Sequence, residues 1–214
     1  MLESFIDPFK NGIDSILHPD IETRSKMGAA KALEMYYRFS LVPAVLGIVV
    51  VVLAVFAATG AAAQAVGLSS QAGGMQLALF SVVALLLQLW VVIPVLILVL
   101  AGMLHVAGKV LGMFKGTYAN TVTAVAYSEL APVSVVWLAA IPIIGPLIIF
   151  VADVYSVWIF LSAAANQHKT TKMNAFIVGL VTVVILAVVV ILIVGAVGFS
   201  LIGKGGLIAP ANVA

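Results

Sequence analysis

The sequence predicts an all-α, polytopic integral membrane protein: a bundle of five transmembrane helices preceded by an amphipathic N-terminal arm on the cytoplasmic side. Of the 214 residues, 64% are hydrophobic and 8% are charged, whereas soluble domains are about 45–50% apolar and about 25% charged. The apolar residues form runs longer than the roughly 18 residues that indicate a membrane helix. These runs lack the polar and apolar alternation of barrel strands. One compact helical membrane domain is therefore expected.

The arm comprises residues 1–39, and its first apolar residues follow the spacing of an amphipathic helix. They are Leu2, Phe5, Ile6, Phe9, Ile13, Ile16 and Leu17. Pro8 interrupts this run, so two short helical pieces fit the pattern equally well. Two placements bury the same face. The helix either packs under the bundle or lies in the headgroup layer, with Phe5, Ile6 and Phe9 in lipid and Lys10 toward the phosphates. A second helix, residues 22–38, is expected to continue into the first span.

Residues 40–203 are predicted to form the membrane domain. The spans are expected at residues 40–63, 77–106, 118–140, 143–165 and 175–202. The second is longer than the roughly 20 residues that a bilayer requires, so it should tilt or bend, with a kink at Pro94. The uncharged stretch 61–76 and the stretch 105–118 are predicted to be loops. Residues 204–214 are a short tail on the other side.

The distribution of positive charge predicts the orientation in the membrane. Nine of the ten lysine and arginine residues fall on one side of the five-span order, and only Lys204 falls on the other. Loops rich in these residues stay in the cytoplasm. A multi-pass protein of the cell membrane is therefore expected, with its N-terminus cytoplasmic and its C-terminus extracytoplasmic.

Several short motifs around the third span occur in a known family. Gly108, Gly112 and Gly116 surround two lysines, the third span contains Tyr127 and Ala131-Pro132, and the link to the fourth is Pro142-Ile143-Ile144-Gly145-Pro146. This pattern resembles the Yip domain family, the Rab-interacting membrane proteins and their prokaryotic relatives, over about residues 21–203. The resemblance implies five spans, a cytoplasmic N-terminus and no enzymatic activity. Eukaryotic members take part in vesicle traffic and bind small GTPases, but their Asp-Leu-Tyr-Gly-Pro stretch is not found here. That difference indicates the prokaryotic branch and argues against GTPase binding.

The three glycines have two structural interpretations. On one helix, their spacing of four would form a small-residue face for close packing. Because two lysines lie beside them, a bent loop with positive φ angles is favoured.

No residue pattern supports catalysis, a cofactor or nucleic-acid binding. The chain has neither a phosphate-binding glycine loop nor a His-Glu-x-x-His helix. His105 and His168 both fall at cytoplasmic ends of spans, but two histidines without fixed spacing are weak evidence for a metal. Solvated histidines at helix ends and no metal site are therefore expected.

Two acids lie deep in apolar runs. Glu129 and Asp153 are about 10 residues inside their spans, which corresponds to roughly 15 Å and the middle of the bilayer. A bare carboxylate there is costly, and no lysine or arginine lies at that depth, so the neutral acid is expected. We expect both to face the bundle interior with Gln88, Tyr127 and Ser156. They serve either as structural hydrogen-bonding groups or as a proton or cation site.

Other polar residues suggest how the spans are arranged. The third span carries a broad polar side, and the fourth is polar on two sides, so the fourth is expected at the centre and the fifth outside. The polar positions of the third span are Asn120, Thr121, Thr123, Tyr127, Ser128 and Ser134, and the fifth span has only Thr182 and Ser200.

Three functions are compatible with the sequence. The family resemblance favours a non-enzymatic scaffold or adaptor for membrane organisation or trafficking-like partner binding. Its partners would be the lipid bilayer and other membrane proteins or a second copy. The alternatives are a small proton- or cation-coupled transporter that uses Glu129 and Asp153, and an accessory subunit of a larger membrane complex.

Overall fold

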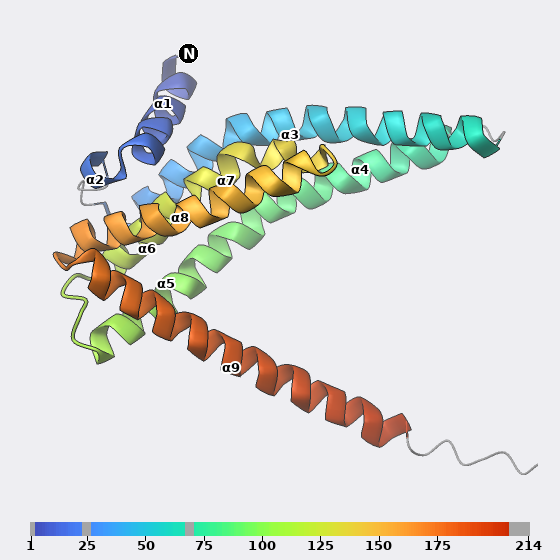
Figure 1. The fold of residues 1–214 in the computed structure, drawn as a ribbon. Helices are drawn as coiled ribbons and strands as arrows, with labels where there is room; N and C mark the ends of the chain where they lie inside the picture. The colour runs from blue at the N-terminus through green and yellow to red at the C-terminus, as the bar shows by residue number, and fades with distance from the viewer. Residues whose placement is uncertain (1–2, 23–26, 67–70, 206–214) are drawn as a thin grey trace, which may run out of the picture.

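The chain forms a bundle of long helices (Figure 1). The computed structural model describes residues 3–22, 27–66 and 71–205, and all regular structure in these ranges is helical. In chain order the elements are α1 (Glu3–Leu17), α2 (Pro19–Glu22), α3 (Ala29–Val66), α4 (Gln71–Leu87), the π-helical turn η1 (Gln88–Val92), α5 (Ile93–Val110), α6 (Tyr118–Ser128), α7 (Leu130–Val135), the 3₁₀ turn η2 (Val136–Ala140), α8 (Ile144–His168) and α9 (Lys172–Gly205).

Five stretches are long and apolar enough to cross a membrane, which confirms the predicted five-helix bundle. They are Ala29–Ala58, Ala78–Val110, Tyr118–Ala139, Ile144–His168 and Lys172–Gly195. Two predicted loops are partly wrong. Helix α3 extends to Val66 and α4 begins at Gln71, because the alanine-rich stretch favours helix even without charges. Helix α5 likewise continues through residues 105–110.

The third span lies at the centre of the bundle. In its most apolar stretch 56% of the residues are buried, against 11–22% in the other four spans. All residues from Thr121 to Ser128 are buried, so this segment is enclosed on every side. Small buried residues such as Ala124 and Ala163 let α6 and α8 pack closely. The prediction that the fourth span is central is therefore wrong. Asp153 and Tyr155, which suggested it, are exposed on α8.

The fifth span is the least buried. Figure 1 shows α9 diverging from the other helices after it passes α5 and α8. Its side chains from Val188 to Val194 are all exposed in the single chain. This divergence opens one side of the bundle between α9 and its neighbours.

Pro94 interrupts the second span, where the preceding turn is π-helical and the Ile93 N–H donates to the Gln88 carbonyl. Ile93 thus does not donate to the Leu89 carbonyl, its α-helical acceptor, and Pro94 has no N–H for the Trp90 carbonyl, so each carbonyl loses its α-helical donor. Two tyrosine hydroxyls of α3 replace it. Tyr36 donates to the Leu89 carbonyl at 3.0 Å, and Tyr37 donates to the Trp90 carbonyl at 3.2 Å. The interruption therefore fastens the first span to the second.

The link between the third and fourth spans is tightly turned. Ile143 has a φ of 67°, and the Ile144 N–H donates to the Pro142 carbonyl at 2.7 Å, which is the rare form of γ-turn. The Gly145 N–H then donates to the Ile141 carbonyl at 2.9 Å. Gly145 lies directly against the backbone of Leu138, so a Cβ there would overlap the Leu138 carbonyl oxygen. Glycine is thus required at this position of the motif, because the backbones of Gly145 and Leu138 lie too close together to admit a side chain.

We expect Gly145→Ala to lower the free energy of unfolding by about 1–3 kcal/mol, because the backbone of η2 must move to admit the methyl group. Gly102→Ala is the control, since a Cβ at Gly102 meets no atom within 4 Å. Thermal unfolding of the purified protein in detergent measures both. Equal stability of the two variants would contradict the close packing of this link.

Candidate functional site

A groove lies between α5, α6, α8 and α9, where α9 begins to diverge. Its volume is about 330 Å³, and most of its wall is apolar. The apolar lining includes Leu100, Leu104, Phe160, Leu161, Phe176 and Leu180. Glu129 is the one ionisable residue in the described lining.

Glu129 stands at a break in the third span. It separates α6 from α7 three residues before Pro132, whose missing N–H leaves the Ser128 carbonyl without a helical donor. The backbone remains compact, since the Val133 N–H donates to the Glu129 carbonyl at 3.2 Å. The Glu129 side chain is half-buried and lines the groove.

The predicted polar cluster assembles only in part. Ser156 lines the groove with Glu129, and Asp153 is close enough to Glu129 for their charges to interact. However, Asp153 is exposed, so the expectation that it faces the interior is wrong for the single chain. Tyr127 is buried and Gln88 is exposed, and neither lines the groove. Asp153 is exposed because α8 is covered mainly on its α6 side, and Gln88 is remote from the groove because η1 packs mainly against α3, α4 and α5.

Three hydroxyl groups accompany Glu129 in the groove wall, and two of them were not predicted. Ser128 donates to the Val125 carbonyl at 2.7 Å, Ser156 to the Asp153 carbonyl at 2.7 Å, and Thr182 to the Val178 carbonyl at 2.8 Å. Each hydroxyl proton is thus committed to its own helix. The groove therefore offers oxygen acceptors in an otherwise apolar wall. The sequence does show Thr182 as an isolated hydroxyl of the Val/Ile-rich fifth span, but nothing in the sequence places it beside Glu129.

A second polar cluster joins the ends of three spans. Thr121 of α6 lies between two histidines, with Oγ1 3.0 Å from Nδ1 of His105 and 3.0 Å from Nε2 of His168. The Gly116 N–H donates to Nδ1 of His168 at 3.2 Å, and the ring of Phe114 stacks on the His168 ring with centroids 4.0 Å apart. His168 is fully buried. The expectation that it is a solvated helix-end residue is therefore wrong.

These contacts fix the protons of the cluster. Because Nδ1 of His168 accepts from a backbone N–H, the ring proton lies on Nε2 and is donated to Thr121. The Thr121 hydroxyl can then donate to Nδ1 of His105, which places the His105 proton on Nε2. Both rings are neutral in this arrangement. Through Thr121 the two rings form a hydrogen-bonded connector between spans. In the part of the chain that the structure describes, no group of three or more metal-ligating residues occurs.

Comparison with known proteins identifies the family. The model of the Yip1 domain matches residues 15–194. The chain belongs to the Yip1 domain family. No curated protein and no solved structure matches the chain. The matched region of the Yip1 domain includes the groove, the histidine cluster and the link between the third and fourth spans.

The three motif glycines of this Yip1 domain have separate roles. Gly112 adopts a positive φ of 69°, as expected for a bent loop. Gly108, by contrast, is helical and buried, and a Cβ there would overlap the ring of Phe114. Gly116 supplies the N–H that binds His168. Together they form the turn that brings Phe114 and His168 into contact.

The N-terminal arm packs on the Yip1 bundle. Figure 1 shows α1 beside the first part of α3, with its N-terminus directed away from the spans. Phe9 stacks on Phe39 with ring centroids 5.2 Å apart, and Gly12 lies against the same ring. Tyr155 of α8 donates to the Ile16 carbonyl at 2.8 Å. Lys10 is exposed, while the side chains of Phe5 and Ile6 lie outside the described residues. This packing favours the docked placement of the arm.

We expect Thr121→Val to lower the free energy of unfolding by about 1–3 kcal/mol, because two histidine nitrogens would lose their partner. Thr182→Val is the matched control. Thr182 is also a buried threonine on a spanning helix, but its hydroxyl bonds only to its own helix. Thermal unfolding in detergent should therefore show the larger loss for Thr121→Val. A smaller loss than in the control would show that the cluster does not connect the spans.

Proposed function

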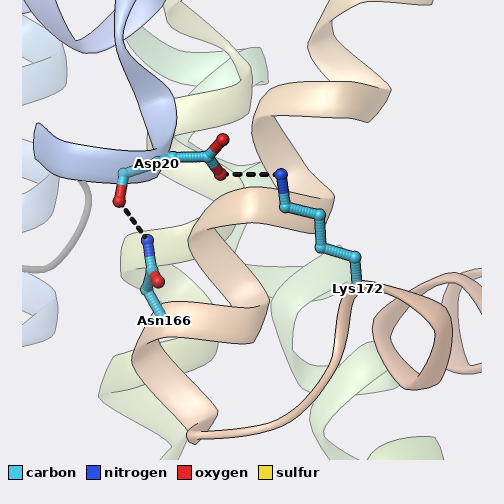
Figure 2. Close-up of polar contacts among 3 residues, drawn as sticks. All are labelled: Asp20, Asn166 and Lys172. Carbon is cyan, nitrogen blue, oxygen red and sulfur yellow. Dashed lines mark hydrogen bonds and ion pairs between the residues drawn. The ribbon is translucent and has the colours of Figure 1, made fainter.

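We propose that this Yip1-family protein is a non-enzymatic membrane adaptor that binds other membrane proteins or a second copy through its cytoplasmic surface. The observation that carries this proposal is the attachment of the arm to the ends of α8 and α9 (Figure 2). Asp20 pairs with Lys172 at 2.7 Å, and its carbonyl accepts a hydrogen bond from Asn166 at 3.2 Å. Lys172 also lies 3.9 Å from the centroid of the Trp158 ring. The arm and two spans thus form one continuous surface, as an adaptor requires.

Exposed positive charges support the proposal that this surface binds partners. Lys109, Lys115 and Lys169 are exposed at the ends of α5, α6 and α8. None of them forms an ion pair with another described residue. Such lysines attract anionic headgroups or acidic segments of a partner. The proposed partner surface therefore combines the arm with these three lysines.

These lysines, together with the positive charges of the arm, favour one orientation in the membrane. We expect the N-terminus to lie in the cytoplasm. A cysteine replacing Ile143, which is exposed in the tight link, should react with an impermeant thiol reagent added to intact cells. A cysteine replacing Thr170 should react only after lysis. The native chain has no cysteine, so the background is low. Labelling of Thr170→Cys in intact cells would contradict this orientation.

The adaptor proposal predicts that loosening the arm removes partner contacts. A Cβ at Gly12 would overlap the buried ring of Phe39, so Gly12→Ala should displace α1. Amine-reactive crosslinking in native membranes should join Lys109, Lys115 or Lys169 to a membrane protein or a second copy. We expect these crosslinks to fall at least severalfold in Gly12→Ala and to persist in Asn11→Ala, because Asn11 is exposed on the same helix.

Proton- or cation-coupled transport is the second candidate, because Glu129 lies at mid-depth in a groove. Flux into liposomes that contain only this protein, and its loss in Glu129→Gln, would support the transporter and overturn the adaptor. An accessory subunit would instead yield one stoichiometric crosslinked complex.

A further inference from the structure

The groove beside Glu129 has the volume and the mixed polar and apolar lining of a ligand site. Its volume of about 330 Å³ falls within the range of roughly 300–1,000 Å³ typical of small-molecule sites. Glu129 lies 11 residues after Tyr118, the first residue of its span. At about 1.5 Å per residue this places the carboxyl group roughly 16 Å below the cytoplasmic end. A ligand that is dissolved in the membrane can therefore reach the carboxyl group at its own depth.

The polar atoms of the groove determine what it can bind. Ser128, Ser156 and Thr182 donate their protons to their own helices, so their oxygens can only accept. The Glu129 carboxyl, ionised when a cation lies beside it, also accepts. Among the described residues that line the groove, none is a lysine or arginine that could neutralise an anion. The matching ligand carries hydrogen-bond donors, and a positive charge on it would balance the carboxylate.

The apolar wall determines the rest of the ligand. A bare inorganic cation prefers about six oxygen ligands, whereas this wall is made largely of leucine, valine and phenylalanine side chains. A phospholipid headgroup resides at the membrane surface, well above Glu129. An alkyl chain that ends in a primary amine satisfies both demands, since N–H groups reach the carboxyl while the chain contacts Leu100, Phe160 and Leu180.

We propose that this groove binds a membrane-dissolved lipophilic amine, with its N–H groups donating to Glu129 and its hydrocarbon chain lying between α5, α8 and α9. An ammonium beside a carboxylate buries no net charge, which makes an acid at this depth tolerable. Gly179 lies in the wall opposite Phe160, and a Cβ there is 3.8 Å from the ring. The absence of a side chain at Gly179 keeps this part of the groove open.

Photolabelling of the full-length protein in nanodiscs tests the site. The probe is octadecylamine with a diazirine in its chain. The comparison probes are octadecanol with the same diazirine and phosphatidylethanolamine with a diazirine in one acyl chain. Mass spectrometry should locate the amine label on α5, α8 or α9. We expect the amine to label the groove at least about tenfold more than the alcohol, as a charge-assisted hydrogen bond implies.

Three variants complete the test. Glu129→Gln should reduce amine labelling about tenfold or more, because it removes the charge of the acceptor. Asp153→Asn removes a nearby acid that does not line the groove. Because this change removes no acceptor for the amine, amine labelling of this variant should differ from the parent by less than about twofold. Gly179→Leu should abolish labelling by filling the groove, and it decides the matter if Glu129→Gln does not fold.

Several results would overturn the proposal. They are equal labelling by amine and alcohol, preferential labelling by phosphatidylethanolamine, and unchanged labelling in folded Glu129→Gln or in Gly179→Leu. The outcome is independent of the adaptor function, since loss of partner crosslinks would leave amine labelling in nanodiscs unchanged.

Discussion

The arrangement of this protein depends on a third span that cannot face lipid. Backbone groups in the hydrocarbon region must find partners within the protein, yet this span is broken at Glu129 and ends as the 3₁₀ turn η2. It also carries buried Thr121, Thr123 and Ser128. Such a segment is stable only when other helices surround it. Its contacts with α3, α5 and α8 supply that enclosure and leave α9, which is almost wholly apolar, at the outside.

The same constraint explains where spans are fastened to one another. The π-helical turn and Pro94 together leave two carbonyls without their α-helical donors, and the hydroxyls of Tyr36 and Tyr37 in the first span donate to them instead. Asn120 of α6 donates to the Gln167 carbonyl of α8 at 2.8 Å. Each contact joins residues about 50 positions apart and fixes the relative height of two helices. Apolar packing alone would define this height weakly, because lipid chains are as apolar as the side chains they replace.

Hydropathy was sufficient to predict the five spans, but it could not show which spans lie next to one another. The polar residues of α8 suggested a central fourth span, but Tyr155 instead binds the carbonyl of Ile16, 139 positions earlier. His105 and His168 carried no spacing signal, because a turn with Gly112 at positive φ brings them together. The groove was partly predictable. The depth of Glu129 follows from counting residues, but the divergence of α9 that opens the groove does not.

Helix α9 belongs to both regions of interest. It begins at Lys172, which pairs with Asp20 of the arm, and its next turns contribute Phe176, Gly179 and Thr182 to the groove. Beyond the groove, the side chains of α9 from Val188 to Val194 are exposed in the single chain. A rigid-body movement of α9 would therefore change the arm contact and the width of the groove together. The surface formed by the arm and the intramembrane groove thus share one wall, helix α9.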